Sequence, residues 1–207
     1  MEFSNNTSLK PYNTFGVDVK ATYFTEASSV EDLKEILSYH KANLNQLPIL
    51  FLGGGSNILL TKDYDGLVIK INLKGISHNE INDQDVIVTS QAGENWHQFV
   101  LFCIENNWGG LENLSLIPGN VGTSPMQNIG AYGVEIKDVF SSCKALNIET
   151  LEVETFNTDD CEFGYRESIF KRKAKGKYIL LEVSFKLSRK NHKIHTAYGA
   201  ISEELKT

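Results

Sequence analysis

Residues 113–134, NLSLIPGNVGTSPMQNIGAYGV, are the most informative stretch of this sequence because they contain no charged residue. The stretch combines four glycines and two prolines with several amide and hydroxyl side chains. A neutral segment of this length is expected to be buried or to surround a bound group, and its polar side chains then need hydrogen-bond partners. A flavin ring, which is neutral and rich in acceptors, would supply such partners. A long structural loop satisfied by its own backbone is the alternative.

A second glycine-rich segment, Gly53-Gly54-Gly55-Ser56-Asn57, directly follows the apolar run Ile49–Leu52. Successive glycines let backbone N–H groups point into one concavity, which suits a phosphate or pyrophosphate. The segment is not a G-x-G-x-x-G dinucleotide motif, because Ile58 replaces the third glycine and residues 58–60 are typical of a strand, not of a helix start. A tight hairpin without a ligand fits this segment equally well.

A third segment, Tyr165-Arg166-Glu167, places an arginine next to an aromatic residue and near Gly164. A guanidinium group binds carboxylates through two parallel hydrogen bonds, so Arg166 is a candidate anion-binding residue. A surface ion pair with Glu167 or with an aspartate is the alternative.

Hydrophobic spacing around the glycine turn predicts a first β-α-β-β unit over residues 1–73. Its strands are expected near residues 21–25, 49–52 and 67–71, after a polar, turn-rich segment at 1–16. A capping box with Ser28 as N-cap and Glu31 three residues later predicts the helix start. The helix then carries Val30, Leu33, Leu37 and Leu44 at helical spacing.

A second unit is predicted over residues 74–207. It contains expected strands at 86–89, at 178–187 and as a pair within 141–156, and residues 188–207 are polar without a clear period. A helix over 94–106 is expected to carry Trp96, Val100, Cys103 and Ile104 on its apolar side.

Composition restricts the possible functions. The chain has 207 residues, 41% of them hydrophobic and 22% charged, with a formal net charge of −6. This acidic balance gives no general attraction to nucleic acid or to anionic membranes. The three widely spaced cysteines form neither a disulfide framework nor a zinc motif, and no other metal site is expected. Without an apolar leader or a membrane-spanning run, the protein is predicted to be cytoplasmic.

Several stretches, taken in order, resemble the UDP-N-acetylenolpyruvoylglucosamine reductase family. They are NTFG at 13–16, GSN at 55–57, AGENW at 92–96, GLENL at 110–114, IPG at 117–119, QNIGAYG at 127–133 and GYRESIF at 164–170. The resemblance implies an α+β FAD-binding fold of the vanillyl-alcohol-oxidase and p-cresol-methylhydroxylase type. Its two subdomains, residues 1–73 and 74–207, would hold noncovalent FAD between them. It also implies the NADPH-dependent reduction of UDP-N-acetylglucosamine enolpyruvate to UDP-N-acetylmuramate, a step of peptidoglycan synthesis.

The same resemblance implies roles for individual residues. Arg166 would be catalytic, and Tyr165 and Tyr198 would contact the substrate. The cofactor-binding residues would be Gly53, Gly55, Ser56, Asn57, Ile58, Pro118, Gly119, Gly122, Thr123, Ser124, Ile129 and Gly133. Gly55→Val is expected to weaken FAD binding, because a side chain there would occupy the space that a phosphate needs.

The resemblance also has limits. Family members continue into a substrate-binding domain with a serine proton donor and a glutamate, and nothing like GSFFKNP occurs in residues 1–207. The chain is therefore expected to be a truncated form that is inactive alone. Two alternatives stay open: a noncovalent FAD-linked oxidase of the same fold, and a non-catalytic nucleotide-binding fragment. Neither residues 53–58 nor residues 113–134 contain a histidine, which disfavours covalent flavin attachment.

Overall fold

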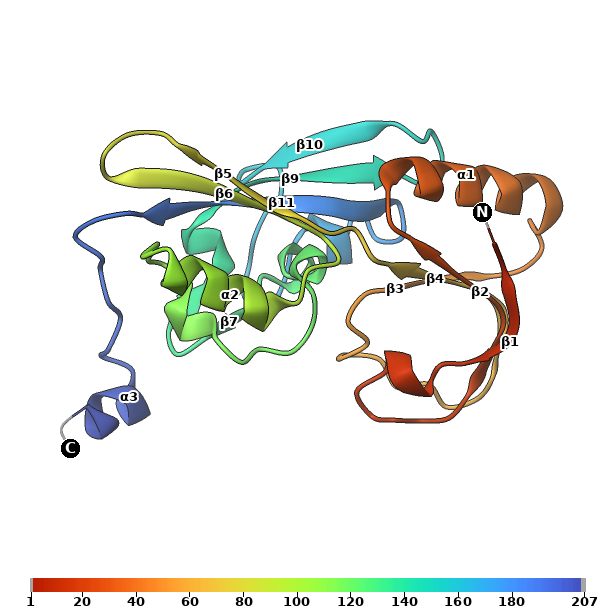
Figure 1. Ribbon diagram of the computed structural model, residues 1–207, viewed down its shortest axis with the longest axis horizontal. Coiled ribbons are helices and arrows are strands. Elements are labelled where there is room, and N and C mark those ends of the chain that lie inside the picture. Colours follow the sequence, from red (N-terminus) through yellow and green to blue (C-terminus); the bar gives the residue numbers. More distant parts are fainter. Residues whose placement is uncertain (1, 206–207) are drawn as a thin grey trace.

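The computed structural model describes residues 2–205 and contains two larger β-sheets that lie side by side along its long axis (Figure 1). The first sheet has the order β1-β2-β4-β3. Strand β1 pairs antiparallel with β2, whereas β2, β4 and β3 run parallel to one another. These elements are β1 (Ser4–Ser8), β2 (Lys20–Ala27), α1 (Val30–Asn43), β3 (Ile49–Leu52) and β4 (Tyr64–Ile71).

The second sheet is antiparallel, with the order β10-β9-β11-β6-β5, and helix α2 covers one of its faces (Figure 1). Its elements are β5 (Ile76–Glu80), β6 (Asp85–Gln91), α2 (Trp96–Glu105), β9 (Phe140–Asn147), β10 (Val153–Asn157) and β11 (Tyr178–Ser188). The remaining regular elements are short. They are the pair β7 (Gly130–Ala131) and β8 (Val134–Glu135), the helix α3 (Gly199–Glu204), and the 3-10 turns Lys10–Tyr12, Glu112–Leu114, Val121–Thr123, Pro125–Gln127, Ile136–Asp138 and Ile169–Lys171.

Helix α1 begins with a capping box that lies one residue later than predicted. The Ser29 hydroxyl accepts a hydrogen bond from the backbone N–H of Asp32 at 3.0 Å, and the Asp32 carboxylate accepts from the N–H of Ser29 at 3.0 Å. Asp32 also accepts from the N–H of Ser28 at 2.9 Å. The assignment of Ser28 as N-cap and Glu31 as its partner is therefore wrong, because the short carboxylate at position 32 satisfies both N–H groups.

The structure differs from the sequence-based expectations at four further places. Strand β1 lies within the segment expected to form turns, and β5 was not expected. Residues 58–60 form no strand, since Leu59 is 63% exposed and no neighbouring strand pairs with it. On α2, Ile104 is 45% exposed and Phe99 is buried in its place.

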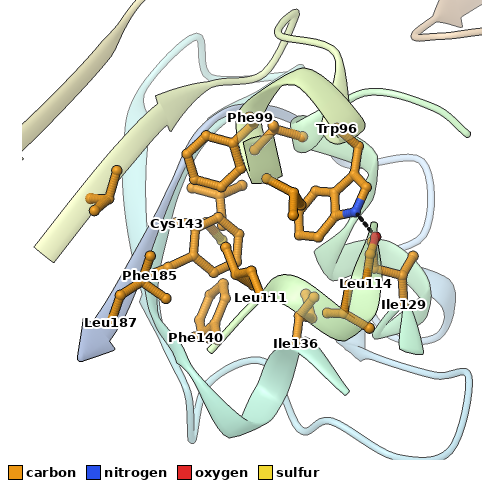
Figure 2. Packing of buried hydrophobic residues seen from close by; sticks show 14 of the residues in the cluster. Trp96, Phe99, Leu111, Leu114, Ile129, Ile136, Phe140, Cys143, Phe185 and Leu187 are labelled. Atoms are coloured by element: carbon orange, nitrogen blue, oxygen red, sulfur yellow. Dashed lines mark hydrogen bonds between the residues drawn. The ribbon is translucent and has the colours of Figure 1, made fainter. Parts of the chain in front are cut away.

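The largest apolar cluster lies between α2 and the second sheet, where the rings of Trp96, Phe99 and Phe185 contact one another (Figure 2). The buried indole N–H of Trp96 donates a 2.8 Å hydrogen bond to the Leu114 carbonyl oxygen, shown as a dashed line in Figure 2. This bond ties the beginning of the uncharged 113–134 stretch to the helix.

A second apolar cluster contains residues from both sheets. Leu33 and Ile36 of α1 and Ile69 of β4 pack in one cluster with Leu146 of β9 and Leu181 of β11. All five side chains are buried. The two units therefore share a continuous core, although each unit has its own sheet. A third cluster, with Leu9, Phe24, Leu52 and Val68 among its members, covers the opposite face of the first sheet.

Two further features of residues 2–205 bear on function. None of their helices is long and apolar enough to cross a membrane. No group of three or more histidine, cysteine, aspartate or glutamate side chains among them is placed to hold a metal ion.

Candidate functional site

The glycine turn leaves the first sheet at the carboxyl end of β3. Because β2, β4 and β3 are parallel, their carboxyl ends meet at one edge of the sheet. Ligands of open parallel sheets bind beyond that edge.

Two glycines of the turn allow two neighbouring segments to approach it closely. Gly55 has φ +66°, and a Cβ atom there would lie 2.0 Å from the Tyr12 carbonyl oxygen. A Cβ atom on Gly54 would lie 2.8 Å from the Cα atom of Gly119. The close approach of Tyr12 therefore already requires glycine at position 55, independently of the phosphate for which it is expected from the sequence.

The turn presents a row of hydrogen-bond donors without acceptors. Across residues 2–205, the backbone N–H groups of residues 54–58 donate no hydrogen bond, and neither do the side chains of Ser56 and Asn57. Groups of this kind that are shielded from solvent are normally satisfied within the protein, by ordered water or by a bound partner. The turn therefore has several donors available for one ligand with many acceptors.

These donors border a cavity of about 310 Å³ that both glycine-rich stretches line. One wall is formed by residues 51–58. The other wall comes from α2 and from the 118–129 segment, and its residues are Trp96, Pro118, Asn120, Thr123, Met126, Gln127 and Ile129. No lining residue carries a charge, so an anion in the cavity would be met by N–H groups and not by a lysine or arginine.

Backbone hydrogen bonds hold the second wall against the segment that precedes α2. The N–H of Val121 donates to the Glu94 carbonyl oxygen at 2.9 Å, and the N–H of Gly122 donates to that of Ala92 at 3.0 Å. A Cβ atom on Gly122 would lie 2.4 Å from the Ala92 Cβ atom, so only glycine permits this approach. The AGENW motif thus fixes the position of the 118–123 backbone.

A second cavity of about 320 Å³ adjoins the first and shares Phe51, Gly53, Thr123 and Met126 with it. Its other walls come from β3, from the beginning of β11 and from residues 170–176. Most of these side chains are aliphatic or aromatic, including Ile148, Phe170 and Ile179. A compartment bordered by free donors and a mostly apolar compartment therefore lie next to each other between the two sheets.

Most of the predicted cofactor-binding residues lie around these two cavities. The first is lined by Gly53, Gly55, Ser56, Asn57, Ile58, Pro118, Thr123 and Ile129, and the second by Gly53, Gly122 and Thr123. Gly119 lies behind the first wall, against Gly54 and Ser56. Ser124 and Gly133 line neither cavity, and the buried Ser124 hydroxyl donates to the Val121 carbonyl oxygen at 2.7 Å.

Arg166 lies at the tip of a tight turn in which Gly164 and Glu167 exchange backbone hydrogen bonds of 3.0 and 3.2 Å. Its φ is +54°, which is unusual for a residue with a side chain. Its guanidinium group makes no ion pair with any described residue. Glu167 instead lies 3.7 Å from Arg172, so the alternative of an Arg166–Glu167 surface pair is wrong.

Two buried polar side chains attach this turn to the cavity wall. The Asn128 amide donates to the Gly164 carbonyl oxygen at 2.9 Å, and its own oxygen accepts from the N–H of Lys137 at 3.2 Å. The Ser168 hydroxyl donates to the Met126 carbonyl oxygen at 2.7 Å. Arg166 and its neighbour Tyr165, which is 86% exposed, are therefore held beside the end of the 118–129 segment.

Tyr198 lies beside the same stretch of chain. Its ring contacts that of Tyr132 edge-on, with centroids 5.8 Å apart, and its Cδ2 atom lies 3.6 Å from the Cβ position of Gly133. The Asn113 amide donates to the His195 carbonyl oxygen at 2.8 Å, which attaches the preceding segment to the same region. The structure thus brings together Tyr198 and Gly133, two residues predicted from distant parts of the sequence.

Sequence reasoning missed several residues of this region. Asn120, Met126 and Gln127 lie in the uncharged stretch, but side-chain type alone does not distinguish cavity-lining from supporting positions. Asn128 was missed because its role depends on a left-handed backbone conformation, φ +43°. Lys70, whose ammonium group donates to the Gly53 carbonyl oxygen, was missed because it lies within a predicted strand.

Comparisons with known proteins agree with this geometry. A family model described as "FAD binding domain" matches residues 21–154. The UDP-N-acetylenolpyruvoylglucosamine reductase of Flavobacterium johnsoniae is 59% identical over 205 residues, which are 99% of this chain and 60% of that protein. The predicted resemblance to these reductases is thereby confirmed. The chain spans about 60% of the length of the curated relatives that it matches.

Solved structures support the fold. The UDP-N-acetylenolpyruvylglucosamine reductase (MurB) of Thermus caldophilus superposes with a TM-score of 0.67 at 22% identity, covering 99% of this chain and 67% of that one. The VAO-type flavoprotein MtVAO713 of Myceliophthora thermophila C1 gives a TM-score of 0.60 at 16% identity, covering 81% and 32%. The predicted α+β fold of the vanillyl-alcohol-oxidase type is confirmed.

Proposed function

Since this chain belongs to the FAD binding domain family, we propose that it binds FAD noncovalently between the glycine turn and the 118–129 segment. The observation that carries this proposal is the row of unengaged N–H groups at residues 54–58, which borders an uncharged cavity. A pyrophosphate offers many acceptors in a small volume, and convergent backbone N–H groups bind such anions well. The Ser56 and Asn57 side chains add further donors.

The two adjoining cavities fit an elongated dinucleotide. Their volumes, about 310 and 320 Å³, together fall within the range of sites for small-molecule cofactors. The pyrophosphate would lie in the compartment with the free donors. The adenosine end would lie in the apolar compartment beside Ile148 and Ile179, and the flavin ring would then extend toward residues 127–133.

We further propose that the complete protein is an NADPH-dependent reductase acting on UDP-N-acetylglucosamine enolpyruvate. The relatives that match nearly the whole chain carry the corresponding reductase name. Bound FAD would supply the hydride-transfer chemistry. The chain's own contribution is to bind and orient the substrate, with Tyr165 and Tyr198 beside it and Arg166 at its carboxylate.

Arg166 is suited to this task because its guanidinium group has no partner within residues 2–205 and its backbone is held in place. Asn128 fixes Gly164, and the Lys171 ammonium donates to the Arg166 carbonyl oxygen at 3.0 Å. A preorganised cation lowers the free energy of a transition state in which negative charge develops on the substrate carboxylate.

The test uses the purified full-length protein, because the chain spans about 60% of the length of its relatives. Titration with FAD in a calorimeter should show saturable binding with one FAD per chain. NADPH oxidation should then require the enolpyruvyl sugar nucleotide and yield UDP-N-acetylmuramate. Oxidation that depends on oxygen, and not on this substrate, would support the FAD-linked oxidase instead. Absence of FAD binding would refute the cofactor proposal.

A further inference from the structure

Lys70 lies at the carboxyl edge of the first sheet, next to the glycine turn. On β4 it pairs with Glu26 of β2 on one side and with Leu52 of β3 on the other. Leu52 directly precedes the glycine turn. Lys70 is therefore placed in the middle of the edge at which a ligand of a parallel sheet binds.

The Lys70 side chain is directed to the turn and not to a carboxylate. Its ammonium group donates to the Gly53 carbonyl oxygen. It makes no ion pair with any residue in the described part of the chain. Its cross-strand neighbour Glu26 instead accepts hydrogen bonds from the Tyr12 hydroxyl and the Asn72 amide.

This contact fixes the orientation of one peptide group. In a trans peptide the carbonyl oxygen and the following N–H point in opposite directions. Because the Gly53 carbonyl points at Lys70, the N–H of Gly54 points away from β4, and Gly54 lines the cavity. That N–H is one of the donors without an acceptor within residues 2–205.

Lys70 also provides positive charge behind a cavity whose lining has none. Burial lowers its pKa below the ordinary value of 10.5; the nearby Glu26 opposes this shift and Lys74 adds a smaller contribution to it. Holding a poorly solvated ammonium group here is costly for the empty protein. A dianionic group on the other side of the turn would offset that cost.

We propose that Lys70 is a positioning residue for the cofactor: it aims the Gly54 N–H at the diphosphate and supplies the positive charge that this group requires. The inference rests on the proposed binding of FAD and assigns a role to a residue outside the cavity lining.

The test compares FAD affinity in the full-length protein carrying Lys70→Met, Lys70→Arg or Lys62→Met. Lys62 is the matched control because it is exposed in the same unit and makes no hydrogen bond or ion pair with any described residue. Lys70→Met should weaken FAD binding roughly 10- to 100-fold, the scale of losing one hydrogen bond to a charged group, here from the Gly54 N–H to the diphosphate. Lys70→Arg should restore most of the affinity, and Lys62→Met should leave it unchanged.

Two further measurements separate positioning from a merely structural role. The FAD affinity of the wild-type protein should fall more steeply with salt than that of Lys70→Met. The FAD-free Lys70→Met protein should be at least as stable as the wild type, because it no longer holds a half-buried ammonium group. Binding by Lys70→Met within twofold of the wild type, or loss of stability without FAD, would overturn the inference and leave FAD binding intact. If the wild type itself bound no FAD, both proposals would fall.

Discussion

Gly55 and Gly16 have almost the same backbone conformation, φ +66° and +64°, but different surroundings. A Cβ atom on Gly55 would meet the Tyr12 carbonyl oxygen at 2.0 Å, whereas nothing lies within 4 Å of that position on Gly16. Both alanine variants should lose about 1 kcal/mol or more from left-handed strain. Gly55→Ala should lose about 1–3 kcal/mol in addition, because the glycine turn or the Tyr12 segment has to shift. Urea unfolding of the two variants measures the difference. Equal losses in the free energy of unfolding would show that the Tyr12 segment moves aside at little cost.

Arg166 can be tested in the full-length protein through turnover and cofactor content together. Arg166→Ala should lower turnover by roughly 10²–10³, the usual effect of removing one electrostatic donor, while FAD content stays the same. Arg172→Ala is the control, because this nearby guanidinium is already paired with Glu162 at 3.4 Å. Undiminished turnover in Arg166→Ala would remove this residue from the proposed mechanism.

The lowered pKa of Lys70 predicts opposite pH effects on stability and on FAD binding. In the window between this lowered pKa and 10.5, the unfolded chain binds more protons than the folded one, so stability without FAD should rise with pH. FAD affinity should fall over the same window, because the ammonium group loses its proton. The charged and titratable groups around Lys70 are Glu26 and Tyr12, which are hydrogen-bonded to each other, and Lys74.

Thermal unfolding and FAD titration, each measured against pH, would test this prediction. The Lys70→Met variant is the control, because its pH profile contains the effects of all other titrating groups, including the flavin, but not that of Lys70. Parallel pH profiles for the wild type and this variant would contradict the assignment.

Residue types revealed much of the candidate site, because an uncharged, glycine-rich stretch is rare and has few explanations. They did not reveal which residues face the cavity. Ser124 and Thr123 are chemically similar neighbours, and each hydroxyl donates to the carbonyl oxygen three residues earlier, yet only Thr123 lines a cavity and Ser124 is buried. Such differences depend on local backbone angles that side-chain composition does not encode.

At the level of elements, the start of α1 gives a direct test of the observed capping box. Ser29→Ala should lower the free energy of unfolding by about 1 kcal/mol, because the backbone N–H of Asp32 loses its acceptor. Ser28→Ala should change it by less than about 0.5 kcal/mol, since the exposed Ser28 hydroxyl makes no hydrogen bond within residues 2–205. Chemical denaturation measures both values. A larger loss for Ser28→Ala would favour the cap originally predicted from the sequence.

The elements that were predicted from sequence are those with a strong apolar pattern, such as β4 and β11. The strands that were missed, β1 and β5, lie at sheet edges and have mostly exposed side chains. They are held chiefly by backbone hydrogen bonds to a neighbouring strand, which leave no periodic apolar signal. The strand predicted at residues 58–60 is absent for the opposite reason. These residues are apolar, but no strand lies next to them.

At the scale of the whole molecule, the shared core predicts that the two units unfold together. Leu146 of β9 is fully buried in the cluster that also contains α1 and β4. Leu146→Ala should cost about 2–5 kcal/mol. Amide hydrogen exchange should then speed up in β2 and β4 of the first sheet as well as in the second sheet.

Val153→Ala on β10 is the control for this experiment, because Val153 is 43% exposed and lies in none of the three apolar clusters. Faster exchange confined to the second sheet would show that the units are independent. The boundary predicted at residue 73 falls between the two sheets, but the second apolar cluster contains residues from both sides of it. Sequence patterns locate strands, whereas the contact between two units forms from residues far apart along the chain.

Trp96 gives this protein an optical reporter of its own. Trp96 is one of the residues that line the cavity with the free N–H groups, and its indole is held in place because it is buried and hydrogen-bonded to Leu114. The other tryptophan, Trp108, is buried against Phe102 and His78 and lines neither of the two cavities between the sheets. In a Trp108→Phe background, emission from Trp96 alone would register any chromophore that enters the cavity, since energy transfer quenches a donor at such short range. Ligand entry could then be followed in real time, without a label.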